Sequence, residues 1–313
     1  MKILLAICSV ALVMATTAGI ATASDFASEI VGYAGSFGAN PYDEPNAVLG
    51  APTTFIKASA TKTFACSMVY SAWNVSPDGE KLIVTLDTDA EIIVGFDHKV
   101  SDDPHNPFGI DFIVFGNAAF RADTAEYLEP DTDMSVCKIA SPAGVLDERV
   151  EVSVAQDPNG PWYTFVDGPW GDDIYPTNAF AWDSQAADWS GELDPLRPVD
   201  PNLGLPDFAG LTVAQAIELY DGSAGGTGFD LKWLAPGDFQ SLAVDPETGR
   251  RWIQYIMVAS DELGEVDAFA DVACCGDYER KPPAGDVNND CRVDMADFAI
   301  MAGNWLECTW KCE

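Results

Sequence analysis

Residues 148–166, with the sequence ERVEVSVAQDPNGPWYTFV, decide the fold class of this chain. Polar and apolar side chains alternate strictly over residues 148–154, which is typical of a β-strand with one buried face and one face in water. Residues 157–160 (DPNG) are a strong turn signal, and the aromatic and β-branched residues at 162–166 suit a partner strand. The stretch therefore predicts a β-hairpin.

Further short runs with strand character lie on both sides of this hairpin. We expect strands where apolar residues alternate or cluster, at residues 81–86, 91–96, 110–115, 252–258 and 266–273. This succession of short strands favours a mainly β fold, either a two-sheet β-sandwich or a jelly roll, over residues 24–280.

The middle of the chain has a different pattern. Residues 168–206 are rich in Pro, Asp and Trp without a clear period, which predicts a long insertion on the surface. Residues 211–220 have apolar side chains at helical spacing, and Thr212 is suited to cap the helix start. The sequence therefore predicts one long insertion and one short helix within the β domain.

The first 23 residues have the pattern of an export signal. Lys2 gives a positive start, residues 3–14 are apolar, and Ala21-Thr22-Ala23 fits cleavage after Ala23. The apolar run is shorter than the roughly 20 residues that a membrane span needs. We therefore expect a signal peptide at residues 1–23 and a secreted protein, extracellular or at the cell surface, with no membrane span.

The charge of the chain is strongly negative. It carries 16 Lys and Arg against 50 Asp and Glu, a net charge of −34. Such a surface repels nucleic acids and anionic membranes, and it attracts metal cations. The alternative origin of this charge is solubility, or adaptation to salt water.

Seven cysteines remain once Cys8 is removed with the signal peptide. In an exported protein we expect disulfides rather than a zinc site, because no C-x-x-C spacing is present. These cysteines are Cys66, Cys137, Cys274, Cys275, Cys291, Cys308 and Cys312.

A twelve-residue loop near the C-terminus has the spacing of a calcium site. It follows a Pro-containing linker at residues 281–285 and reads DVNNDCRVDMAD over residues 286–297. Oxygen ligands fall at positions one, three, five, seven, nine and twelve, which a seven-coordinate calcium site requires. These ligands would be Asp286, Asn288, Asp290, the backbone carbonyl of Arg292, Asp294 and Asp297.

This loop and the apolar run after it resemble one type I dockerin repeat, whose loop ends in Asp and continues directly into a helix. The resemblance implies an EF-hand-like helical calcium module over residues 286–313 and a cohesin-like or cell-surface partner. Positions ten and eleven, with which the family often recognises cohesin, are here Met295 and Ala296. The alternative is that the loop only folds the tail around Ca²⁺.

Cys291 stands at position six of the loop, where Gly is usual because the turn favours a positive φ. A disulfide from Cys291 to Cys308 or to Cys312 would offset the backbone strain that a residue other than Gly has there.

Two sets of residues in the large domain resemble a group of secreted bacterial cell-surface proteins. One comprises residues 95–98 and 109–120, and the other comprises residues 225–231 and 265–272. The resemblance implies a secreted β-sandwich and no particular reaction.

Oxygen-bearing side chains within these runs suggest a second calcium site, and the alternative is that these side chains face water. They are Asp111, Asn117, Glu265, Asp267 and Asp271.

No established catalytic motif appears in the sequence. The two histidines, His98 and His105, fall in a stretch rich in Pro and Asp that we interpret as a loop, and neither G-x-S-x-G nor H-E-x-x-H is present. Five aromatic residues near the hairpin and the insertion could stack on sugar rings, or they could fill a core. These are Trp162, Tyr163, Trp170, Trp182 and Trp189.

The composition and motifs together favour a non-catalytic, calcium-dependent binding protein with polysaccharide as its ligand. The alternative function is a polysaccharide-degrading glycoside hydrolase tethered by the dockerin-like tail. A third interpretation is a structural protein of the cell envelope.

Overall fold

The computed structural model describes residues 24–123, 128–272, 284, 285, 287, 293 and 295–305. In this part the chain is mainly β, as the sequence predicts, and its strands form several small antiparallel sheets. No helix among these residues is long and apolar enough to cross a membrane.

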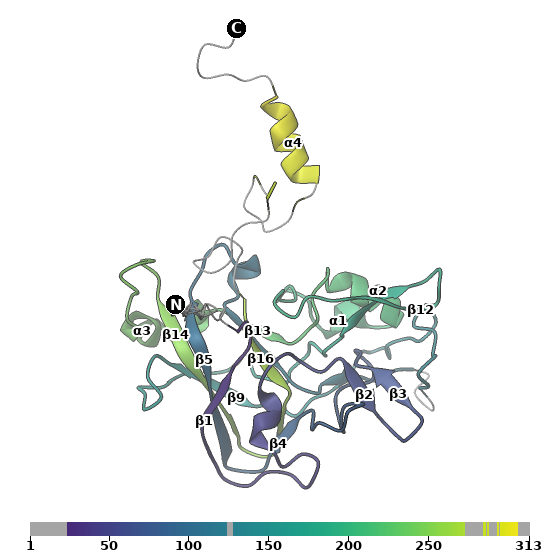
Figure 1. Ribbon diagram of the computed structural model, residues 1–313, viewed down its shortest axis with the longest axis horizontal. Helices are drawn as coiled ribbons and strands as arrows, with labels where there is room; N and C mark the ends of the chain where they lie inside the picture. Colours follow the sequence, from purple (N-terminus) through teal and green to yellow (C-terminus); the bar gives the residue numbers. More distant parts are fainter. Residues whose placement is uncertain are drawn as a thin grey trace, which may run out of the picture.

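The largest sheet has five strands in the order β1-β5-β14-β9-β10. Their bounds are β1 Glu29–Ala34, β5 Ala90–Ser101, β14 Trp252–Ser260, β9 Glu151–Ala155 and β10 Tyr163–Thr164. The predicted hairpin is confirmed, because β9 pairs with β10 through Tyr163 opposite Val154. Figure 1 shows β5 and β14 side by side near the middle of this sheet.

A second sheet of three strands has the order β13-β6-β16. Its strands are β13 Thr227–Phe229, β6 Phe112–Phe115 and β16 Ala268–Asp271. The main hydrophobic core contains side chains from both sheets, among them Phe96 and Ile256 from the first and Phe112, Phe229 and Phe269 from the second. Phe112 and Phe229 stack with their ring centroids 4.9 Å apart. Burial of these rings is therefore what holds the two sheets together.

The predicted insertion is not simply a surface excursion. It contains the hairpin of β11 Phe180–Asp183 and β12 Asp188–Glu192, and it ends in α1 Leu205–Phe208. Within it, Phe180 and Val199 are buried, and Val199 belongs to a second core with Phe208 and Tyr220, at the end of the molecule where α1, α2 and β12 lie (Figure 1). The expectation of a surface segment is wrong because scattered aromatic side chains can fill a core without any periodic pattern.

The predicted short helix is confirmed as α2 Val213–Leu219. Thr212 caps it, since its Oγ1 accepts a hydrogen bond of 3.2 Å from the N–H of Gln215. The Gln215 side chain accepts one of 3.0 Å from the N–H of Thr212 in return. Two N–H groups of the first turn are thereby satisfied.

The remaining elements are short. They are η1 Pro45–Val48, β2 Phe55–Lys57, β3 Thr63–Ala65, β4 Val84–Leu86, η2 Pro107–Gly109, β7 Ala119–Phe120, β8 Val145–Leu146, η3 Leu231–Trp233, α3 Pro236–Ser241, β15 Gly264–Val266 and α4 Met295–Gly303. The run at 266–273, expected to be one strand, divides into β15 and β16 around Asp267. Helix α4 contains residues 298–303, where the sequence predicts a helix after the calcium loop, but it begins at Met295, within the last three positions of the predicted loop.

Candidate metal centre

Most of the predicted calcium ligands in the tail lie outside the described residues. These are Asp286, Asn288, Asp290, Arg292 and Asp294, so their ligand roles stay predictions. Asp297 is described and lies in the first turn of α4 with its side chain fully buried. Its Oδ1 accepts a hydrogen bond of 2.7 Å from the N–H of Val287. Position two of the predicted loop is therefore in contact with position twelve.

A second contact brings other parts of the same loop together. Gly285 has a φ of +113°, and a Cβ placed on it would lie 3.2 Å from Cγ1 of Val293. Position eight of the loop is thus packed against the residue that precedes position one. With the contact between Val287 and Asp297, two pairs of described residues from the beginning and the end of the predicted loop therefore lie close together.

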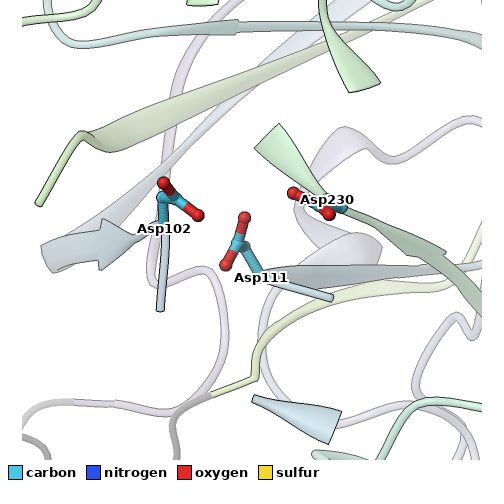
Figure 2. Close-up of side chains that lie close together, drawn as sticks. All are labelled: Asp102, Asp111 and Asp230. Carbon is cyan, nitrogen blue, oxygen red and sulfur yellow. The ribbon is translucent and has the colours of Figure 1, made fainter. Parts of the chain in front are cut away.

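Three aspartates in the large domain form a separate acidic triad, Asp102, Asp111 and Asp230. Asp102 follows β5, Asp111 precedes β6 and Asp230 follows β13. One carboxylate oxygen from each lies within 4.8 Å of the others. Figure 2 shows the three side chains facing one another, with Asp111 between the other two in this view. These oxygens could hold a hard cation such as Ca²⁺.

Asp111 is the buried centre of this triad. Its Oδ2 accepts a hydrogen bond of 2.8 Å from the N–H of Leu231, and its Oδ1 accepts one of 3.1 Å from the N–H of Asp103. Burial raises the pKa of Asp111 well above its usual range, and the nearby charges of Asp102 and Asp230 add to this rise. The side chain thus joins the segments after β5 and after β13, whether or not a cation is bound.

Lys232 supplies a positive charge beside the triad. Its ammonium forms an ion pair with Asp102. Burial opposes the charge of Lys232, but the hydrogen bond to Asp102 and the neighbouring charge of Asp230 raise its pKa. Burial also raises the pKa of Asp230. A divalent cation at the triad would therefore compete with Lys232 for the carboxylate of Asp102.

The five side chains that suggest a second calcium site do not come together in the structure. Asp111 belongs to the triad, whereas Glu265 accepts a hydrogen bond of 2.7 Å from Thr85 Oγ1. Asp267 accepts hydrogen bonds from the N–H and Oγ1 of Thr53 at 2.9 and 2.8 Å. Burial raises the pKa of Asp267 to about 7. The interpretation of all five as one site is wrong, because donors from different segments bind the carboxylates of Asp111, Glu265 and Asp267.

The same set is not a row of side chains in water either. Asp111, Asp267 and Asp271 are buried. Asp102 and Asp230 were not among the candidates, although both directly follow a strand. Asp230 lies within one of the runs that carry the family resemblance, and β13 of that run pairs with β6 of the other. The sequence therefore placed Asp111 and Asp230 in runs of interest. Only the pairing of β6 with β13 shows that these two aspartates lie close together.

A cleft of about 490 Å³ lies elsewhere on the large domain. Most of its lining is acidic, and it contains Asp147, Glu148, Arg149, Glu151, Trp170, Ala259, Asp261, Glu262 and Leu263. Arg149 pairs with Asp147 at 2.7 Å and with Asp173 at 2.8 Å. Its guanidinium also lies over the Trp170 ring, 5.1 Å from the centroid. Burial raises the pKa of Glu148, and the charges of Glu265 and Asp147 add to the rise.

The five aromatic candidates for sugar binding are divided between this cleft and the cores. Trp170 lines the cleft, and Trp162 is half-buried in the chain between β9 and β10. Tyr163 packs against the main core. Trp182 and Trp189 pack edge to face with ring centroids 5.1 Å apart, against the second core. The core interpretation therefore applies to these last three rings, and Trp170 is left as the aromatic side chain of the cleft.

Of the two histidines, His98 does not lie in a loop as expected. It belongs to β5, and its ring contacts Asp97 Oδ1 at 2.9 Å and Asp271 Oδ2 at 2.8 Å. Burial opposes its charge, but the hydrogen bonds that its ring N–H groups donate to these two carboxylates raise the pKa of His98 to about 9. His105 lies outside the strands and contacts Asp103. His98 is therefore a charged partner for carboxylates rather than a base poised near neutral pH.

Cys66 and Cys137 are both buried thiols that form no disulfide, so the expectation of disulfides is wrong for these two. Burial raises the pKa of the Cys66 thiol well above its usual range. The other predicted disulfide cysteines, Cys274, Cys275, Cys291, Cys308 and Cys312, lie outside the described residues.

Comparison with known proteins adds no relative from which function can be transferred. No protein-family model matches the chain, and no curated protein matches its sequence.

Proposed function

We propose that this protein is a secreted calcium-binding protein, extracellular or at the cell surface, whose β-sandwich domain is a non-catalytic binding module. The observation that carries the proposal is the oxygen spacing of residues 286–297, in which the last ligand position, Asp297, is buried and in contact with Val287. A carboxylate that is removed from water needs hydrogen bonds or a cation. Asp297 accepts a hydrogen bond from Val287, and Ca²⁺ bound by the six predicted ligands would be a further partner for this carboxylate.

The tail is also suited to attachment. Helix α4 exposes Phe298 at 57% and Met301 at 42% relative exposure, and Trp305, two residues after the helix ends, is 75% exposed. Exposed apolar residues along one helix are a common way to bind a partner. A cohesin-like or cell-surface protein is the partner that we propose. The alternative role, in which Ca²⁺ only folds the tail, predicts the same metal binding without a partner.

The acidic cleft is the proposed site for polysaccharide. It combines the aromatic ring of Trp170 with several carboxylates, which accept hydrogen bonds from sugar hydroxyls. Arg149 supplies donors beside the ring. The excess of acids in the lining favours a neutral or cationic polysaccharide over an anionic one.

A glycoside hydrolase is the second candidate, and Glu148 is the observation that favours it. This half-buried carboxyl lies in the cleft and has a raised pKa, as a general acid in glycoside hydrolysis does. The hydrolase would need a second carboxylate at a suitable distance, for which the cleft offers Glu151, Asp261 and Glu262.

One experiment separates these functions. The chain from Ser24 to Glu313 is incubated with a panel of insoluble neutral, cationic and anionic polysaccharides, in Ca²⁺ or in chelator. Retention on a neutral or cationic polysaccharide without release of reducing sugar supports the binding module. Release of reducing sugar supports the hydrolase, and the absence of both favours a structural envelope protein and contradicts the proposal.

A further inference from the structure

The first described residues of the chain run along the edge of both sheets. Phe26 forms a β-bridge with Ala270, and the N–H of Ala27 donates a hydrogen bond of 3.1 Å to the carbonyl of Phe269. The N–H of Ser28 donates one of 2.9 Å to the carbonyl of Gly95 in β5. The segment that begins at Ser24 is thus fixed by backbone pairing to β16 and to β5.

This pairing places the backbone nitrogen of Ser24 directly on a carboxylate. The nitrogen lies 3.2 Å from Oδ1 and 3.1 Å from Oδ2 of Asp97. His98 contacts the same carboxylate on one side of its ring and Asp271 on the other. Ser24, Asp97, His98 and Asp271 therefore form a continuous row of polar contacts.

Ser24 is also the residue that directly follows the predicted signal-peptide cleavage site. Hydrolysis of the Ala23–Ser24 peptide bond by water leaves a carboxylate on Ala23 and an ammonium group on Ser24. In the uncleaved chain one neutral N–H serves both oxygens of Asp97. After cleavage the same nitrogen has three donors and a positive charge.

We propose that removal of the signal peptide creates an ammonium group on Ser24 that pairs with Asp97, completes a row of alternating charges with His98 and Asp271, and so stabilises the N-terminal segment against β16. The proposal rests on the proposed export but not on calcium or on polysaccharide. Asp97 is the key partner. Its side chain is 43% exposed, so the effect is modest and sensitive to salt.

The contact between the Ser24 nitrogen and Asp97 explains why cleavage of the Ala23–Ser24 bond suits the fold. A cut one residue earlier would leave Ala23 between the ammonium and Asp97. A cut later would remove the nitrogen that contacts Asp97 and then, residue by residue, the pairing of Phe26 and Ala27 with β16. The geometry therefore assigns the new N-terminus a structural role at one position.

Four chains test this proposal. One begins at Ser24 and one at Ala23, each with Asp97 and as the D97N variant. The pKa of the α-amine is measured by the pH dependence of its acylation, and the midpoint of thermal unfolding is measured at pH 7 in low salt. For the chain that begins at Ser24 we expect an α-amine pKa roughly half a unit above the usual value near 8, and a usual value in D97N.

The chain that begins at Ser24 is also expected to unfold about 1–2 °C higher than the chain that begins at Ala23, with no such difference between the two D97N chains. An α-amine pKa that is the same in wild type and D97N would overturn the proposal, as would an unfolding difference that D97N preserves. If D97N does not fold, the comparison is made on wild type in low salt and in 1 M salt. In 1 M salt the pKa shift of the Ser24 α-amine must disappear, because salt screens an exposed ion pair.

Discussion

The backbone N–H of Val287 donates a hydrogen bond of 2.7 Å to the Oδ1 of Asp297. This contact joins the second and the last positions of the predicted calcium loop. A carboxylate at the start of a helix is stabilised by the helix dipole, and Asp297 lies in the first turn of α4. The helix therefore favours a charged carboxylate at position twelve, where the predicted Ca²⁺ requires one.

Asp111 is expected to stabilise the large domain through its two backbone contacts. Asp111→Ala leaves the buried N–H groups of Leu231 and Asp103 without this acceptor, which should cost about 2–4 kcal/mol in the free energy of unfolding. Asp111→Asn keeps one acceptor oxygen and should cost less. Chemical denaturation measures both. A cost below about 0.5 kcal/mol for Asp111→Ala, the range of surface substitutions, would show that the contacts do not matter.

His98 is expected to make stability depend on pH in the alkaline range. Its pKa is about 9 in the folded chain and 6.5 in its usual state. Because the folded chain holds the proton more tightly, this contribution is fully present below pH 6.5 and is lost as the pH rises through 9.

The measurement is denaturant unfolding of wild type and His98→Gln from pH 6 to pH 10. The difference in unfolding free energy between the two should shrink across this window. A difference that stays constant from pH 6 to pH 10 would argue against a charged His98 between Asp97 and Asp271.

Trp170 is expected to carry much of the affinity for polysaccharide. Trp170→Ala should weaken retention on the bound polysaccharide roughly tenfold, because a packed aromatic ring contributes more than its buried area alone. Trp73→Ala is a suitable control, since Trp73 is 39% exposed and does not line the cleft. Equal retention of both variants would place the ligand elsewhere.

Glu148 distinguishes binding from hydrolysis at the same cleft. In the proposed binding module, Glu148→Gln keeps retention within about threefold, since an amide still forms hydrogen bonds with hydroxyls. Neither form should release reducing sugar. Release by wild type that Glu148→Gln abolishes would replace the binding module with the hydrolase.

Cys66 and Cys137 are expected to be unreactive thiols in the folded chain. Both are buried, and burial raises the pKa of Cys66, so little reactive thiolate forms. Thiol titration of wild type and of the double variant Cys66→Ala, Cys137→Ala should give equal counts in the folded state. In denaturant, wild type should show two more reactive thiols than the variant. Equal counts in denaturant would mean that these two cysteines are oxidised.

The sequence was most informative where structure is local. The alternation at 148–154 and the turn at 157–160 predict the hairpin of β9 and β10, and the cap at Thr212 predicts the start of α2. These features depend on neighbours along the chain, so that a short window contains what is needed.

The site depended on long-range register, which a single sequence does not contain. Asp102, Asp111 and Asp230 meet because β13 pairs with β6 and because the chain after β5 returns to the same end. Asp267, by contrast, is satisfied by Thr53, more than 200 residues away in sequence. Among 50 acidic residues, the sequence alone does not distinguish an aspartate of the triad from one that is hydrogen-bonded like Asp267.

Calorimetric titration of Ca²⁺ into the metal-free chain from Ser24 to Glu313 tests the central proposal most directly, with wild type beside Asp286→Ala and Asp297→Ala. Asp78→Ala serves as the control, because Asp78 is exposed and distant in sequence from the loop. We predict saturable binding by wild type and Asp78→Ala, and an affinity lower by at least about tenfold in both loop variants. Binding of the same affinity in all four chains, or no saturable heat in wild type, would contradict a calcium site at residues 286–297.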